Sequence, residues 1–214
     1  MLCLITGSLC LSFLNCASDE LKHASKLPVP KGKYIDQFGQ DKFAKWPEKV
    51  QSIADLKALE KVEQADLAVY KAVPDRDLYQ AWTKGPQLKA TGFFRLEKLD
   101  EKWWLVAPNG HIYYSLGIDC VGAGAHTPLH KANRAAIQAL PGLNSEFKDA
   151  YNHNRAFSFY ICNLIRKWGK TWRTEFEKRA IDRCKSWGFT CFANWSDDGF
   201  AKSKLPYLST GPAC

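Results

Sequence analysis

The feature that most constrains the fold is a succession of four segments between residues 111 and 195. They are a strand, a long connecting segment (residues 120–174, here called the excursion), a helix and a second strand. Stretches 111–119 (HIYYSLGID) and 189–195 (FTCFANW) are rich in the β-branched and aromatic residues typical of strands. The helix before the second strand has an apolar face, with Thr174 as its expected N-cap and Gly188 as its end. Such a unit favours parallel pairing, with a functional site at the carboxyl ends of the strands.

The excursion between the two strands is too long for a simple connection. Residues 120–174 contain several glycines and prolines, with short helices expected near 129–140 and 157–168. Excursions of this length in compact domains generally build a functional rim.

An antiparallel meander is expected before this unit. Its strands are 93–97, 103–106 and 111–119, separated by turns at Asp100-Glu101 and Asn109-Gly110. Residues 74–86 are expected to be irregular. Neighbouring side chains point to opposite faces of a strand, so at most one ring of the pair Trp103-Trp104 should face solvent.

The chain divides into four parts on this interpretation. They are a signal or lipoprotein-type segment (1–16), a linker (17–33), an N-terminal arm (34–91), and the meander with the first βα units (92–214). The arm contains a helix over 52–70, for which Ser52 is the expected N-cap and Asp55 its partner.

Residues 1–16 are apolar and uncharged, but fewer than the roughly 20 needed to span a bilayer. An export signal is the favoured interpretation. Phe13-Leu-Asn-Cys16 loosely resembles a lipobox, which makes Cys16 a candidate lipidation site; simple cleavage and a buried helix remain alternatives. The expected location is periplasmic, outer-membrane-anchored or extracellular, with any membrane attachment through the N-terminal lipid alone.

Charge and motifs exclude several classes of function. The net charge is +8, but the basic residues are interspersed with acids, so no nucleic-acid partner is expected. Three of the eight cysteines lie in residues 1–16. The other five form no CxxC, and buried thiols are the main interpretation for them, with a Cys184–Cys191 bridge left open. Pro128 separates His126 from His130, so no metal site is expected, and no nucleotide motif is present.

Five residues are candidates for substrate binding. Asp119 ends the first parallel strand, and Asn194 and Trp195 end the second. Asp197 follows closely, and His126 lies in the excursion. Asn194 and the acids could bind hydroxyl groups, and Trp195 could stack on a flat ligand. The alternatives are hydrogen bonds to loop backbone for the acids and core packing or turn formation for Asn194 and Trp195.

Several short motifs, taken in order, resemble the start of agarase-like and β-galactosidase-like glycoside hydrolases. They are Ala90-Thr-Gly-Phe-Phe-Arg95, Trp103-Trp-Leu-Val106, Pro108-Asn-Gly-His111, Ser115-Leu-Gly-Ile-Asp-Cys120, Trp187-Gly-Phe189 and Asn194-Trp-Ser-Asp197. The resemblance implies an α/β fold, the start of a truncated (β/α)8 (TIM) barrel preceded by a helical arm and a β-meander. It also implies a β-galactoside-containing polysaccharide as substrate, cleaved with retention by two glutamates and no cofactor.

The resemblance also implies where those glutamates lie, after the fourth and seventh barrel strands. A barrel of this kind takes about 250 residues, and this chain reaches only its second or third strand. We therefore expect no catalytic residue in this chain and no activity from it alone. The alternatives are a non-catalytic surface lipoprotein that binds polysaccharide around Trp195, and a purely structural envelope lipoprotein.

Overall fold

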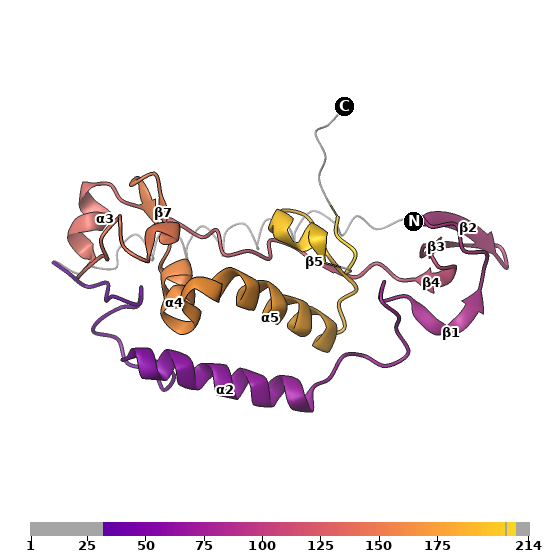
Figure 1. Ribbon diagram of the computed structural model, residues 1–214, viewed down its shortest axis with the longest axis horizontal. Helices are drawn as coiled ribbons and strands as arrows, with labels where there is room; N and C mark the ends of the chain where they lie inside the picture. Colours follow the sequence, from indigo (N-terminus) through magenta and orange to yellow (C-terminus); the bar gives the residue numbers. More distant parts are fainter. Residues whose placement is uncertain (1–31, 204, 209–214) are drawn as a thin grey trace, which may run out of the picture.

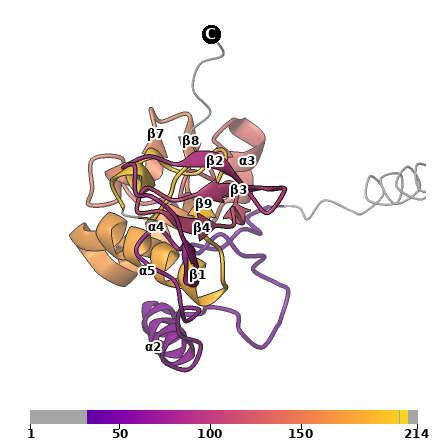
Figure 2. The ribbon, with the colours of Figure 1, turned by 90° about the vertical axis from the view of Figure 1, so that its right-hand side faces the viewer.

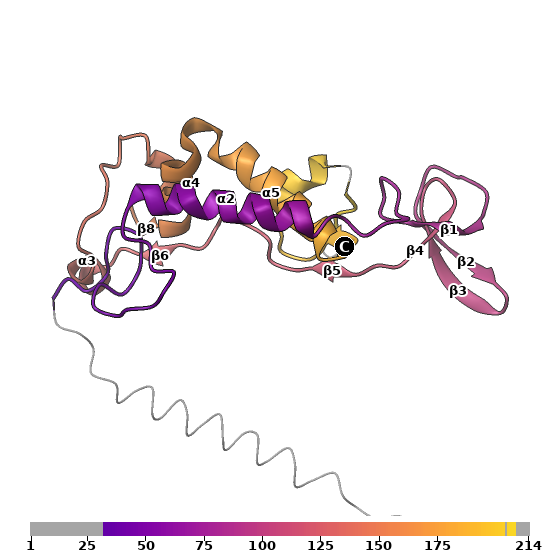
Figure 3. The same ribbon diagram turned by 90° about the horizontal axis from the view of Figure 1, so that it is seen from below.

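The computed structural model describes residues 32–203 and 205–208, so the predicted segment 1–16 and its Cys16 lie outside the described residues. The molecule is elongated, with a four-stranded sheet at one end and a short helix at the other (Figure 1). Helix α2 runs alongside α4 and α5, which follow each other along the long axis (Figures 1 and 3). The helices span α2 (Ile53–Val69), α3 (Lys131–Ala136), α4 (Phe159–Trp168) and α5 (Trp172–Ser186).

The sheet at one end is antiparallel, in the order β1-β4-β3-β2, and it faces the viewer in Figure 2. Its strands are β1 (Trp82–Gln87), β2 (Arg95–Leu99), β3 (Lys102–Val106) and β4 (His111–Tyr113). The three expected strands are present, although their bounds differ. Asp100 and Glu101 both have positive φ, at 49° and 61°, as a tight turn of the right twist requires.

Strand β1 was not expected, because residues 74–86 were predicted to be irregular. Trp82 pairs with Ile112 and Gln87 with His111, and the register shifts between these two pairs. Pro86 cannot donate a hydrogen bond, but β1 is an edge strand with an irregular register, where proline is tolerated.

The second correction in this sheet concerns the two tryptophans. Trp103 is 69% exposed, and Trp104 is also exposed. The hairpin of β2 and β3 projects from the end of the molecule, so neither ring is packed into the core (Figure 1).

The expected strand 111–119 is divided between two sheets. Its first part is β4, and its second part is β5 (Gly117–Ile118), which pairs in parallel with β9 (Cys191–Phe192). The Thr190 hydroxyl secures the join, because it donates to the Tyr114 carbonyl at 2.8 Å and accepts from the Leu116 N–H at 2.7 Å. Tyr207 forms a further parallel bridge to Phe192, so three chain segments run parallel here.

Short elements fill the excursion between the two parallel strands. They are β6 (Thr127–Pro128), η1 (Lys148–Ala150), β7 (Tyr151–Asn152), β8 (Ala156–Phe157) and η2 (Gly169–Thr171), and η3 (Asp198–Lys202) follows β9. Helix α5 starts at Trp172, so Thr174 is not its N-cap as expected; η2 leads directly into the helix from α4. Gly188, with φ of 81°, follows its end as predicted.

The main core lies between β9 and helices α4 and α5. Phe192 is fully buried and stacks on Phe200 with the ring centroids 4.1 Å apart. Cys162 and Cys184 are buried in the same cluster. Among the described residues the four cysteines, Cys120, Cys162, Cys184 and Cys191, are free thiols. No helix in the described part of the chain is long and apolar enough to cross a membrane.

Candidate functional site

The carboxyl ends of β5 and β9 meet at one edge of the parallel sheet. Asp119 directly follows β5, and Asn194 lies two residues beyond β9. The ladder continues to this point, since the Cys120 N–H donates to the Asn194 carbonyl at 2.9 Å. The predicted parallel pairing of these two chain segments is therefore confirmed. Their carboxyl ends form one shared rim.

The backbone takes an uncommon conformation two residues after β5 and three residues after β9. Cys120 has φ of 59° and Trp195 has φ of 60°, in the left-handed region that bulky side chains rarely adopt. Such positions carry strain that the surrounding structure must hold, and they gather at functional sites. At Trp195 the result is an indole ring that is 73% exposed rather than packed in the core. The alternative of core packing for Trp195 is thereby wrong.

Asp197 fastens the loop after β9 to the loop after β5. Its carboxylate accepts a hydrogen bond from the Ala123 N–H at 3.2 Å, and its own N–H donates to the Val121 carbonyl at 2.8 Å. A Cβ atom on Gly122 would lie 2.6 Å from the Asp197 Oδ1 atom. Any side chain at position 122 would therefore have to displace this carboxylate.

A polar cavity of about 380 Å³ lies beside these hydrogen bonds between the two loops. It is lined by Ala123, Gly124, His126, Asp149, Tyr151, Asn152, His153, Ile161, Arg173 and Asp197. His126 Nδ1 lies 2.5 Å from the Gly124 carbonyl oxygen, which can only accept, so Nδ1 is the protonated nitrogen. In the neutral imidazole the Nε2 atom is then the acceptor.

Two of the five predicted residues, His126 and Asp197, line this cavity. Asp119, Asn194 and Trp195 lie at the strand ends but do not line it. Sequence reasoning missed Asp149, His153 and Arg173, which also line it. Arg173 lies in the first turn of α5, and nothing in the local sequence indicates that this turn faces the loop after β9.

The chemistry of this cavity suits binding. Its carboxylates are Asp149 and Asp197, and each accepts a hydrogen bond from the protein, Asp149 from the Trp172 indole N–H at 3.2 Å. Histidine, arginine and amide groups add donors and acceptors around them. The described residues contain no group of three or more His, Cys, Asp or Glu side chains that could hold a metal ion.

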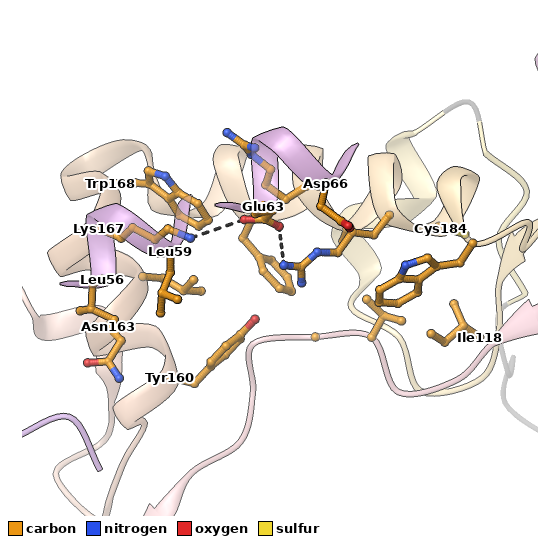
Figure 4. Close-up of a pocket in the computed structure, with 18 of the residues that line it drawn as sticks. Leu56, Leu59, Glu63, Asp66, Ile118, Tyr160, Asn163, Lys167, Trp168 and Cys184 are labelled. Atoms are coloured by element: carbon orange, nitrogen blue, oxygen red, sulfur yellow. Dashed lines mark hydrogen bonds and ion pairs between the residues drawn. The ribbon is translucent and has the colours of Figure 1, made fainter. Parts of the chain in front are cut away.

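A larger groove, of about 870 Å³, lies between α2, α4, α5 and β5 (Figure 4). None of the five predicted residues lines it. Its walls are mainly apolar, and Leu59, Tyr160 and Ile118 point toward the open space (Figure 4). Burial raises the pKa of the Tyr160 hydroxyl, which therefore stays protonated at neutral pH.

Four of the five charged side chains that line this groove, all except Asp66, form ion pairs. Glu63 of α2 forms ion pairs with Arg183 at 2.5 Å and with Lys167 at 3.5 Å (Figure 4). Arg179 pairs with Glu60 of α2 at 3.1 Å. These pairs hold α2 onto α4 and α5. The groove therefore offers few free polar groups to a sugar, and the smaller cavity at the strand ends is the better candidate site.

Comparison with known proteins shows a clear similarity to agarases. β-Agarase B of Vibrio sp. (strain JT0107) is 33% identical over 210 residues, covering 83% of this chain and 22% of that protein. β-Agarase A of the same strain is 25% identical over 201 residues, covering 82% of this chain and 20% of that protein. No family model matches the chain.

Solved structures give the same result. An exo-β-agarase superposes with a TM-score of 0.72 at 26% identity, covering 85% of this chain and 33% of that one. The agarase AgWH50C superposes with a TM-score of 0.71 at 31% identity, covering 82% and 29%. The chain thus spans about a fifth of the length of the curated relatives. Over most of its own length it is homologous to β-agarases.

Proposed function

We propose that the chain is part of an exported glycoside hydrolase that acts on an agarose-type β-galactan, and that its strand ends form part of the substrate site. The observation that carries this proposal is the 33% identity to a β-agarase over 83% of the chain. The exposed indole of Trp195 and the polar cavity beside Asp197 support it, because sugar sites combine a ring that stacks with groups that bind hydroxyls.

The fold proposed for the whole enzyme is a (β/α)8 barrel that begins with β5. Three observations support it. Strands β5 and β9 are parallel, and Tyr207 adds a parallel segment beyond β9. In the sequence α5 lies between β5 and β9, which is the order of elements in a βαβ unit. The apolar groove along α2 and β5 would then be covered by later parts of the barrel.

The two glutamates of a retaining mechanism are proposed to lie outside this chain. Neither carboxylate in the polar cavity belongs to a glutamate, and each already accepts a hydrogen bond from the protein. The chain is therefore proposed to bind agarose without cleaving it. Sequencing the gene beyond the codon for Cys214 tests this directly, since a continuing reading frame with two suitably placed glutamates is expected.

Affinity electrophoresis tests the binding itself. We expect agarose in a native gel to retard the 214-residue chain, and Trp195→Ala to weaken the affinity about fivefold, while Trp195→Phe retains most of it. Trp103→Ala is the matched control, because this tryptophan is also exposed but lies on the meander. Retardation equal for wild type and Trp195→Ala would refute the proposed site. Release of reducing sugar by the chain would refute the proposed lack of activity.

The other proposal for the chain, a non-catalytic surface lipoprotein that binds polysaccharide, shares the binding but not the glutamates. A stop codon after Cys214 together with agarose binding would favour it. Cys16 would then be the lipid attachment site, and labelling with a radioactive fatty acid in cells would detect it, with Cys16→Ser as the control.

A further inference from the structure

The loop formed by residues 40–50, here called the 40–50 loop, is closed by side chains that bind its own backbone. The Gln40 side-chain amide donates to the Val50 carbonyl at 2.7 Å and accepts from the Val50 N–H at 3.0 Å. The Lys49 ammonium donates to three backbone carbonyls, those of Asp41, Lys42 and Ala44, at 2.7, 3.0 and 2.7 Å. The loop therefore has a fixed shape although most of its residues are exposed.

The segment that leads into this loop docks on the excursion that carries His126. The Ile35 N–H donates to the Ala136 carbonyl at 2.9 Å, and the Gln138 N–H donates to the Ile35 carbonyl at 2.8 Å. The loop thus lies beside α3, at the end of the molecule opposite the meander, on the side toward which β5 runs (Figures 1 and 3). Strand β7, which supplies Tyr151 and Asn152 to the polar cavity, lies toward the same end of the molecule (Figure 1).

Two aromatic rings of the 40–50 loop face solvent. Phe43 is 66% exposed and Trp46 is 39% exposed, and both line a cavity of about 560 Å³. The Lys49 ammonium lies 5.1 Å from the centre of the Trp46 ring, which fixes that ring. Leaving two rings in water on a rigid loop forgoes the free energy of burying them, and binding a flat ligand recovers it.

The polar groups of this cavity indicate the class of ligand. The Lys49 ammonium has all three of its protons engaged, and the Asp36 carboxylate accepts hydrogen bonds from the Phe38 and Gln40 N–H groups. The side chains of Gln51 and Gln138 and the amines of Lys42 and Lys45 also line the cavity. Rings, amides and amines are groups that bind the apolar face and the hydroxyls of a sugar.

We propose that the 40–50 loop is a second sugar-binding site, in which Phe43 and Trp46 stack on units of the galactan chain away from those at the strand ends. This inference rests on the proposed function for the identity of the polymer. The loop adds a second point of attachment on one polysaccharide, which raises the affinity for the polymer without any contact to the reacting bond.

Agarose affinity electrophoresis of the 214-residue chain tests the proposal. Phe43→Ala and Trp46→Ala are each expected to weaken the affinity about fivefold, and Phe43→Tyr to retain it. Trp103→Ala should have no effect, because its ring lies on the meander at the far end. Phe43 contributes little to folding because it is mostly exposed, and circular dichroism of each variant checks this.

The Trp195→Ala variant separates this inference from the proposed function. Loss of affinity in Trp195→Ala with wild-type affinity in both loop variants would overturn the second site and leave the proposed function standing. Loss in the loop variants alone would support the second site and overturn the site at the strand ends. If all variants were retarded as strongly as the wild type, or if agarose did not retard the wild-type chain at all, both proposed sites would be overturned.

Discussion

The Asp197 carboxylate accepts a hydrogen bond from the Ala123 backbone N–H at 3.2 Å, so that the loop after one parallel strand is fastened to the loop after the other. Ser196 strengthens the tie, because its hydroxyl accepts from the Val121 N–H at 3.2 Å. Asp197 and Ala123 are far apart in the sequence, yet their contact sets the spacing of the two loops from which Trp195 projects.

Loss of the Asp197 side chain should loosen this rim. Asp197→Ala leaves the Ala123 N–H without its acceptor in a partly buried place, and we expect it to reduce the free energy of unfolding by about 1–3 kcal/mol. Urea denaturation followed by tryptophan fluorescence measures the change. Asp197→Asn keeps an acceptor oxygen and should lose less. A free energy of unfolding equal to wild type in Asp197→Ala would show that the tie is not needed for folding.

Glu63 of α2 is expected to contribute more to the free energy of unfolding than an exposed acid on the neighbouring helix α5. Its side chain is 9% exposed and that of its partner Lys167 is 13% exposed, so Glu63→Gln leaves a poorly hydrated ammonium without its counter-charge. Breaking such a pair from one side costs about 3–5 kcal/mol when fully buried, and we expect about 2 kcal/mol here. Thermal unfolding of the variant measures this loss.

The matched control for Glu63 is the exposed pair of Lys178 and Asp182 on α5, whose atoms lie 2.7 Å apart. Asp182→Asn should cost less than about 1 kcal/mol, because water hydrates both partners. Added salt should not remove the difference between the two variants, since screening acts mainly on the exposed pair. Equal losses in the two variants would contradict a special role for the Glu63 pairs in holding α2.

Local signals in the sequence predicted those parts of the fold that depend on neighbouring residues. The capping box is an example: the Asp55 N–H donates to the Ser52 hydroxyl at 3.2 Å, and the Ser52 N–H donates to the Asp55 carboxylate at 2.9 Å. Strand β1 was missed because Gly85 and Pro86 normally interrupt a strand, and only its edge position in the sheet tolerates them.

The candidate site shows the same division between local and long-range information. Asp119 and Asn194 could be placed together from the sequence, because parallel strands bring their carboxyl ends to one edge. Asp149 and His153 could not, because their positions depend on how the long excursion folds back through β7 and β8. The Asp149 contact to Trp172 joins two elements that no local pattern relates.

Gly110 should be the most sensitive glycine of the meander. It has φ of 92°, and a Cβ atom there would lie 2.1 Å from the Leu88 carbonyl oxygen, so Gly110→Ala adds a backbone clash to conformational strain. Gly92→Ala is the control, because φ is 83° there but nothing lies within 4 Å. We expect a loss of about 1 kcal/mol for Gly92→Ala and clearly more for Gly110→Ala in urea denaturation. Equal losses would refute the role of the clash.

Cys120 and Cys184 should differ strongly in reactivity. Burial, with a smaller effect of Cys191, raises the pKa of the Cys184 thiol from 9.0 to about 12, whereas Cys120 is exposed at the end of β5. In native protein at mildly alkaline pH, iodoacetamide should modify Cys120 and spare Cys184, as measured by mass spectrometry of peptides. In denaturing urea both should react, which controls for the chemistry of the two peptides.

The same raised pKa makes the stability of the fold depend on pH in the alkaline range. The folded state holds the Cys184 proton more tightly than the unfolded state, so this thiol contributes stability that is complete below about pH 9 and is lost as the pH rises toward 12. Cys184→Ala removes this dependence, and its free energy of unfolding should fall less steeply with pH than that of wild type. Parallel slopes for the two proteins across this range would show that the Cys184 thiol does not ionise on unfolding as the burial requires.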